Sequence, residues 1–183
     1  MNTRTHRWGK AMRRGATRLS ISTSGSERLG RGGRQFVMTI RSAAKMLGVS
    51  GGDWTISFVD DEAMMELHQR SMGLATTTDV LTFDLSDAAE VPAERSTIEL
   101  DTVICIDEAA RRAAELGHPL LHEVLLYGVH SLLHVLGHDD TTPAKSKAMH
   151  RREDEILTAL GIGPVFHKPR LRRAARQKRG GGR

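Results

Sequence analysis

Two histidines, His130 and His134, lie four residues apart in a strongly apolar segment of the chain. Residues at this spacing lie one above the other on the same face of a helix, so both imidazoles can bind one metal ion. Gly137 follows three residues after the second histidine, and it predicts a helix end with a turn in the left-handed conformation. That turn can bring a third ligand towards the pair. Three protein ligands indicate a catalytic zinc site with one position left for water.

Two residues after the turn are candidates for the third ligand. Asp140 lies ten residues after His130, which gives the His-x3-His-x5-ligand spacing of the long metalloprotease motif. A carboxylate is an acceptable zinc ligand. His138 stands closer to the helix end, where the direction of its side chain is harder to derive from the sequence. We predict one Zn²⁺ per chain bound by His130, His134 and Asp140, with His138 as the alternative third ligand.

The residue after the first histidine argues against peptide hydrolysis. Metalloproteases with this spacing carry a glutamate there as the general base. This chain has Ser131 at that position, and a serine hydroxyl cannot take a proton from zinc-bound water at neutral pH. A zinc metallopeptidase is therefore the least favoured function that we consider.

Three segments together resemble the YbeY family of bacterial endoribonucleases. The segment His130 to Asp140 is similar to the family signature His-Gly-x-Leu-His-Leu-x-Gly-Tyr-Asp-His, with Asp140 in the position of the third histidine. Thr78 to Phe83 resembles the family's Thr-Asp-Val-Leu-Ser-Phe strand, and Asp101 to Cys105 resembles its Asp-Ile-Val-Ile-Cys strand. The resemblance runs from about Trp54 to Leu160, in the order in which the family has these segments.

This resemblance implies a zinc-dependent endoribonuclease, specific for single-stranded RNA, with a zincin-like helix carrying the metal site. It further implies a role in maturation of the 3′ end of 16S ribosomal RNA and in ribosome quality control, with the small ribosomal subunit or its proteins as partners. The alternative is a ribosome-associated, RNA-binding biogenesis factor whose zinc is mainly structural.

One family feature is displaced in this chain. The family carries an arginine before the Thr-Asp-Val-Leu strand, suited to bind a phosphate through two hydrogen bonds. An ungapped comparison puts Met72 in that position, and Arg70, two residues away, is the only arginine of the segment. We therefore predict a catalytic set of His130, His134 and Arg70.

Apolar periodicity and turn residues predict the elements that position these side chains. The expected strands are 17–22, 54–59, 79–84 and 97–107. The expected helices are 35–47, 61–72, 108–116, 119–136 and 143–160. This order predicts an α+β domain with a small mixed sheet of about four strands packed by several helices. Other polar residues have ordinary interpretations: Asp60 as a helix cap, Glu123 as a surface carboxylate, His118 as solvent-facing, and 87–95 as a surface loop.

Charge divides the chain into three parts. Residues 1–35 carry nine basic residues and one acidic residue, and 164–183 carry eight basic residues and no acidic one. The segment 36–163 carries ten basic and 21 acidic residues. We therefore expect a folded hydrolase domain at 17–163 between two disordered basic extensions, 1–16 and 164–183. Such extensions commonly bind nucleic acid by releasing counterions from its phosphates, so we expect both to contact RNA.

Composition also bounds the cellular location. The longest apolar runs are far too short to cross a bilayer, and the basic N-terminal segment lacks the apolar core of a secretory signal. A single cysteine, Cys105, cannot form an intrachain disulfide and suits a reducing compartment. We expect a cytoplasmic protein.

Overall fold

A computed structural model describes residues 18–74, 76–86 and 91–166. Its strands are β1 (Leu19–Ser24), β2 (Gly51–Val59), β3 (Val80–Asp84) and β4 (Thr97–Cys105). Its helices are α1 (Gly32–Met46), α2 (Asp61–Met72), α3 (Ile106–Leu116), α4 (Leu120–Val135) and α5 (Pro143–Ala159), with short 3₁₀ turns at Ser26–Leu29 and Pro92–Glu94. The predicted α+β class with a mixed four-stranded sheet is confirmed. The expected disorder of the two basic extensions concerns residues outside the described ranges.

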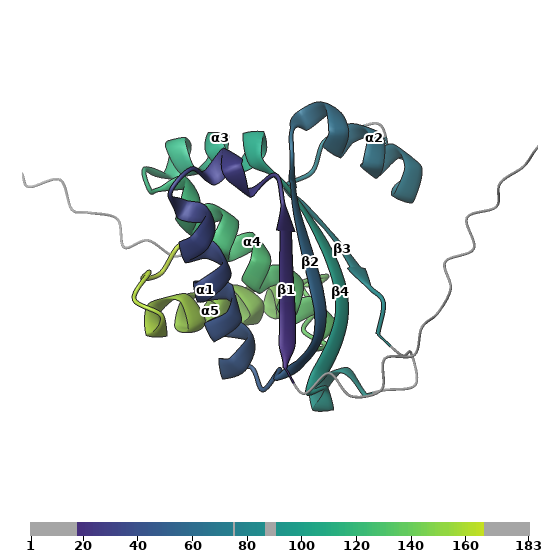
Figure 1. Cartoon of the computed structure of the whole chain (residues 1–183), viewed down its shortest axis with the longest axis vertical. Helices are drawn as coiled ribbons and strands as arrows, with labels where there is room; N and C mark the ends of the chain where they lie inside the picture. The colour runs from purple at the N-terminus through teal and green to yellow at the C-terminus, as the bar shows by residue number, and fades with distance from the viewer. Residues whose placement is uncertain (1–17, 75, 87–90, 167–183) are drawn as a thin grey trace, which may run out of the picture.

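The sheet has the strand order β1-β2-β4-β3. β1, β2 and β4 are parallel, whereas β3 pairs antiparallel with β4 and forms one edge. Alternate side chains of β2, namely Trp54, Ile56 and Phe58, are buried, as the period of two along a strand requires. Figure 1 shows α1, α3, α4 and α5 on one side of the sheet and α2 on the other.

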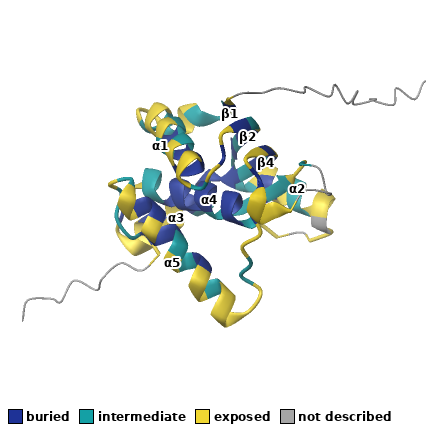
Figure 2. Ribbon diagram, turned by 90° about the horizontal axis from the view of Figure 1, so that it is seen from below, coloured by how far each residue is buried: buried dark blue, intermediate teal, exposed yellow. Residues whose placement is uncertain are grey.

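α4 is the centre of the core, and Figure 2 shows it in dark blue among the other helices. Leu125, Val129, Leu132 and Leu133 are fully buried there, which fits a helix that is apolar on nearly all sides. Gly128 allows α1 to pack closely, because a Cβ atom at this position would lie only 2.8 Å from Cδ1 of Ile40. The helix with the paired histidines is therefore held by neighbours all round.

Several predicted boundaries hold and others shift, among them the starts of β2, at Gly51 instead of 54, and of α1, at Gly32 instead of 35. α2 begins and ends where predicted, and the side chain of its cap Asp60 accepts a hydrogen bond from the Ala63 N–H at 3.0 Å. The predicted strand 97–107 was too long, since it ends at Cys105 and Ile106 begins α3. An apolar residue fits either element, and here Ile106 is buried on the same helix face as Ala109 and Ala113. The first strand covers 19–24 rather than 17–22.

The folded chain continues past residue 163, where the basic extension was expected to begin. Val165 is buried in the core cluster, and its N–H donates a hydrogen bond to Oδ1 of Asp154 at 2.9 Å. Phe166 donates to the same oxygen at 3.0 Å. This fastens the end of the described chain to α5. No helix within the described ranges is long and apolar enough to cross a membrane.

Candidate metal centre and the adjoining pocket

His130 and His134 lie in the last two turns of α4, as the spacing predicted. Their Nε2 atoms are 3.1 Å apart, and both side chains are partly buried. The rings meet edge to face, with centroids 4.5 Å apart and planes at 89°. The two nitrogens therefore face the same point in space, from which one ion could contact both.

The turn after α4 brings Asp140 to this point. Gly137 has φ +88°, and the His138 N–H donates to the carbonyl of Leu133 at 2.9 Å, so the chain folds back over the helix end. Oδ2 of Asp140 lies 3.8 Å from Nε2 of each histidine. Among the described residues, His130, His134 and Asp140 form the one cluster whose ligand atoms all lie close enough for a metal ion, within 4.8 Å of one another.

His138, the alternative third ligand, is used differently. Its side chain is exposed, and its backbone carbonyl lies 3.2 Å from Nδ1 of His134. Burial lowers the pKa of His138, and the charges of Arg152 and His134 lower it further. The geometry therefore supports Asp140 over His138, and the identity of the third ligand remains a prediction.

The dimensions of the cluster fit a transition-metal ion. In a tetrahedral zinc site with bonds of about 2.0–2.1 Å, two ligand atoms lie roughly 3.3 Å apart. The distances of 3.1, 3.8 and 3.8 Å in the cluster are within a small side-chain adjustment of this value. Each histidine directs Nδ1 to an oxygen of the protein and leaves Nε2 towards the cluster. Two imidazoles and one carboxylate are a donor set that zinc accepts.

A buried carboxylate from α5 orients the first histidine. Oε1 of Glu153 lies 2.7 Å from Nδ1 of His130, and Oε2 lies 2.8 Å from Nδ1 of His150. The Glu153 side chain is only 1% exposed. Burial lowers the pKa of His130, but the hydrogen bond and charge of Glu153, with the charges of Asp140 and Asp79, outweigh it and raise the pKa overall.

Ser131 links the metal-site helix to the edge strand. It is fully buried, and its hydroxyl oxygen accepts a hydrogen bond from the hydroxyl of Thr82 on β3 at 2.9 Å. The side chain in the place of a peptidase's general base is thus a structural contact between α4 and β3. This agrees with the sequence argument against a peptidase.

Arg95 and Asp139 hold the two sides of the turn. Arg95 was expected in a surface loop but is buried, and its Nη1 donates to Oδ2 of Asp84 at 2.5 Å and to the carbonyl of Val135 at 3.2 Å. That expectation was wrong because the guanidinium closes the end of α4 instead of facing water. Asp139 accepts hydrogen bonds from Lys145 and Thr141, which hold its pKa well below the ordinary value.

Arg70 is not brought to the cluster. It lies on α2 with 76% of its side chain exposed, where its Nη2 pairs with Oε2 of Glu66 at 3.1 Å. It is not among the residues that line the pocket beside His130. The side chain of Met72 lies outside what the structure describes. A catalytic role for Arg70 remains a prediction without geometric support.

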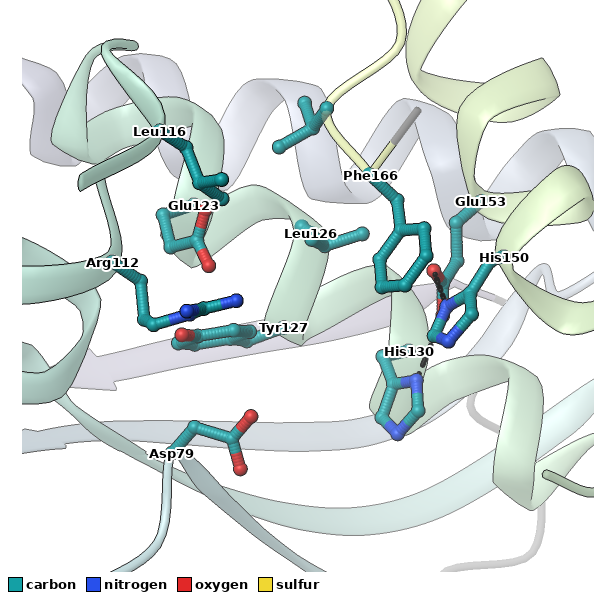
Figure 3. Close-up of a pocket in the computed structure, with 11 residues that line it drawn as sticks. Asp79, Arg112, Leu116, Glu123, Leu126, Tyr127, His130, His150, Glu153 and Phe166 are labelled. Carbon is teal, nitrogen blue, oxygen red and sulfur yellow. Dashed lines mark hydrogen bonds and ion pairs between the residues drawn. The ribbon is translucent and has the colours of Figure 1, made fainter. Parts of the chain in front are cut away.

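A pocket of about 210 Å³ adjoins the cluster, and His130 forms part of its wall. Figure 3 shows side chains from α3, α4, α5 and the segment before β3 around this space. The lining residues are Asp79, Arg112, Leu116, Glu123, Leu126, Tyr127, His130, His150, Glu153, Val165 and Phe166. We call this space the side pocket.

The expectations for Glu123 and His118 were wrong. Their side chains are only 3% and 1% exposed, with Oε2 of Glu123 lying 2.8 Å from Nε2 of His118. Burial raises the pKa of Glu123, and the hydrogen bond of Tyr127 and the charge of His118 oppose this only in part. Polar residues in the first turn of a helix normally face water, but here α3 packs against α4, and its residues Arg112 and Leu116 line the side pocket with Glu123.

The fold and the cluster define a class of α+β proteins with a His-x3-His-x5-ligand constellation at the end of a buried helix. Comparison with known proteins narrows this class. A family model described as "Endoribonuclease YbeY" matches residues 28–161. The chain therefore belongs to the endoribonuclease YbeY family, and the resemblance inferred from three short segments is confirmed.

Individual relatives agree with this assignment. An endoribonuclease YbeY from Geobacillus thermodenitrificans is 34% identical over 129 residues, which cover 67% of this chain and 83% of the relative. One from Desulforamulus reducens is 39% identical over 107 residues, covering 57% and 70%. The solution structure of a Thermotoga maritima protein aligns with a TM-score of 0.51 over 85% of this chain and 99% of that chain. At 19% identity this last likeness concerns the fold alone.

Sequence reasoning missed Glu153, although the sequence carries a signal for it. Met149, Ile156 and Leu157 form the buried stripe of α5, and Glu153 lies four residues after Met149 on the same face. A charged residue on an apolar stripe needs a partner. For Arg95 we find no comparable signal, since it lies in a loop and on no helical stripe or strand face.

Proposed function

We propose that this protein is a zinc-dependent endoribonuclease that cuts single-stranded RNA. The observation that carries the proposal is the convergence of His130, His134 and Asp140, whose ligand atoms lie within 4.8 Å of one another. Membership of a family whose relatives are named endoribonucleases supplies the reaction type. When bound, zinc supplies a Lewis acid and activates water for attack on a phosphodiester.

The residues around the cluster prepare the ligands. Glu153 accepts the Nδ1 proton of His130, which leaves the Nε2 lone pair directed at the cluster. The carbonyl of His138 does the same for His134. Arg95 and Asp139 fix the turn that carries Asp140. The chain therefore holds three donor atoms in place before an ion or a substrate arrives.

RNA binding would rely on the basic extensions. The segment 36–163 is acidic and would by itself repel a polyanion, whereas the extensions 1–16 and 164–183 carry five and eight basic residues and no acidic one. We propose that the extensions bind RNA phosphates and deliver the strand to the cluster. In this account the substrate is ribosomal RNA, and the reaction matures the 3′ end of 16S RNA and serves ribosome quality control. The protein acts in the cytoplasm, with the small ribosomal subunit as its partner.

Salt dependence tests the role of the extensions. Each phosphate neutralised by a lysine or arginine adds to the fall of affinity with salt. Removal of 1–16 and 167–183, which leaves the buried Val165 in place, should flatten the plot of log affinity against log salt for a single-stranded RNA. An unchanged slope would exclude the extensions from RNA binding.

The second candidate is an RNA-binding biogenesis factor with a mainly structural zinc. The exposed, Glu66-paired position of Arg70 favours it, because this arginine does not line the side pocket beside His130. Turnover separates the two candidates. In the first, a purified full chain loaded with zinc cuts a labelled single-stranded RNA but not its duplex. In the second, both RNAs stay intact and His134→Ala loses only stability.

A further inference from the structure

The side pocket has the size of a single ring system. Pockets that enclose drug-sized ligands measure about 300–1,000 Å³, and the side pocket measures about 210 Å³. His130 lines the side pocket and is also a candidate metal ligand, so a group in the pocket would lie next to whatever lies at the metal cluster. For a single-stranded RNA, the group of this size next to a phosphodiester is a nucleobase.

Two aromatic side chains stand on the walls of the side pocket. Tyr127 lies one turn before His130 on α4, and Phe166 comes from the end of the described chain (Figure 3). Phe166 is 47% exposed, yet its ring is fixed in place by stacking on His150, with centroids 3.5 Å apart and planes at 10°. An exposed ring held in this way, like that of Phe166, is a usual platform for the bases of single-stranded RNA, whereas Tyr127 is largely buried.

The charges in the side pocket favour a base over a phosphate. Asp79, Glu123 and Glu153 contribute three carboxyl groups, and Arg112 is the one arginine among the described lining residues. Glu153 is occupied by two histidines and Glu123 by His118. Among the three lining carboxyl groups, Asp79 is therefore the one that the described contacts do not pair with a histidine, and its charge disfavours a phosphate group.

Asp79 is well placed to read a base. Its Oδ1 accepts hydrogen bonds from the Val80 N–H at 2.9 Å and the Thr78 hydroxyl at 3.2 Å, which fix the carboxylate at the start of β3. Figure 3 shows it on the opposite side of the space from Phe166. A carboxylate accepts hydrogen bonds from an exocyclic amino group, which adenine, cytosine and guanine carry and uracil lacks. At the position where cytosine carries its amino group, uracil carries a carbonyl oxygen and loses this hydrogen bond.

We propose that the side pocket binds the nucleobase next to the phosphodiester at the metal cluster, and that Asp79 selects amino-bearing bases over uracil. This inference rests on the proposed function, because it assumes that single-stranded RNA is the substrate. It assigns to the chain a base preference at one nucleotide, which the metal cluster alone does not supply.

Binding of free nucleosides tests the proposal without cleavage and without a phosphate that could bind metal. Cytidine and uridine have rings of the same size and differ in the exocyclic group. In a titration of the full chain followed by NMR, cytidine should bind about tenfold more tightly than uridine, the order of discrimination expected from one good base contact. Asp79→Asn should reduce the preference to within about twofold, because an amide can also donate. Asp53→Asn on the exposed surface of β2 is the matched control and should retain the preference.

A second variant covers the case in which Asp79→Asn does not fold. Phe166→Ala removes a half-exposed ring and should weaken cytidine and uridine by a similar factor, leaving their ratio unchanged. Equal affinities for cytidine and uridine in the unaltered chain, or full affinity in Phe166→Ala, would overturn the proposal. RNA cleavage with no preference at any nucleotide would overturn it while leaving the proposed function intact. If the chain prefers cytidine but cuts no RNA, the proposed nuclease function is refuted and base binding in the side pocket is supported.

Discussion

The carboxylate of Glu153 lies 2.7 Å from Nδ1 of His130, although the two residues are 23 positions apart and belong to different helices. This hydrogen bond fixes which imidazole nitrogen faces the cluster. Because Glu153 also holds His150 and is almost fully buried, it is a rigid part of the core that acts on the candidate metal centre through His130.

Glu153→Gln should weaken zinc binding by about 10–100-fold, the usual cost of losing an oriented partner behind a ligand histidine. The amide keeps the shape of the side chain but not the charge. Competition of the protein with a chelating dye measures the affinity. Glu155→Gln on the exposed face of α5 is the matched control, and equal affinities of the two variants would contradict a role for Glu153.

The affinity for zinc should decrease as the pH is lowered. Because Nδ1 of both histidines is hydrogen-bonded, the metal must bind the lone pair on Nε2, and a proton there competes with the ion. The raised pKa of His130 keeps that proton bound at a higher pH than for an ordinary histidine. Affinity should therefore be full above this pKa and decline as the pH falls through it. Removing the charge in Glu153→Gln lowers the pKa of His130, so the decline should move to lower pH. If the decline in zinc affinity moved to higher pH instead, Glu153 would not be the group that raises the pKa of His130.

The third ligand can be identified by metal content. Asp140→Ala should lose most of the bound zinc after dialysis, because one of the three donor atoms is removed. His138→Ala should retain it, since only its backbone carbonyl contacts the site. Elemental analysis of both variants beside the unaltered chain is sufficient. Loss of zinc in His138→Ala with retention in Asp140→Ala would reverse our assignment.

Arg95→Met should destabilise the fold by about 1–3 kcal/mol, because the carbonyl of Val135 and the carboxylate of Asp84 lose a charged donor. Asp84 is partly exposed, which limits the cost. Urea unfolding measures the difference. Arg151→Met, at a residue with 75% of its side chain exposed, should change stability by less than about 0.5 kcal/mol. Equal effects of the two substitutions would refute the role given to Arg95.

The features that the sequence predicted well depend on local spacing. The start of α2 follows from its cap Asp60, and the pairing of His130 with His134 follows from the helical repeat. Gly137 predicted the turn because a positive φ is costly for other residues. Each of these signals lies within a few residues of the feature that it predicts.

The features that the sequence did not predict depend on tertiary contacts. Glu153 reaches His130 from another helix, and Arg95 reaches the end of α4 from 40 residues away. The burial of His118 and Glu123 follows from the packing of α3 against α4. Because such contacts join segments that are distant in the sequence, they cannot be predicted from hydrophobic periodicity or from secondary-structure propensity.

The central claim is that one metal ion at His130, His134 and Asp140 is required to cut single-stranded RNA. The most direct test is to titrate the metal-free full chain with zinc while following cleavage of a labelled single-stranded RNA. We predict that the rate rises to a plateau at one zinc per chain and that folded His134→Ala, purified in the same way, stays at background throughout. A rate that is independent of zinc, or one that His134→Ala retains, would contradict the claim.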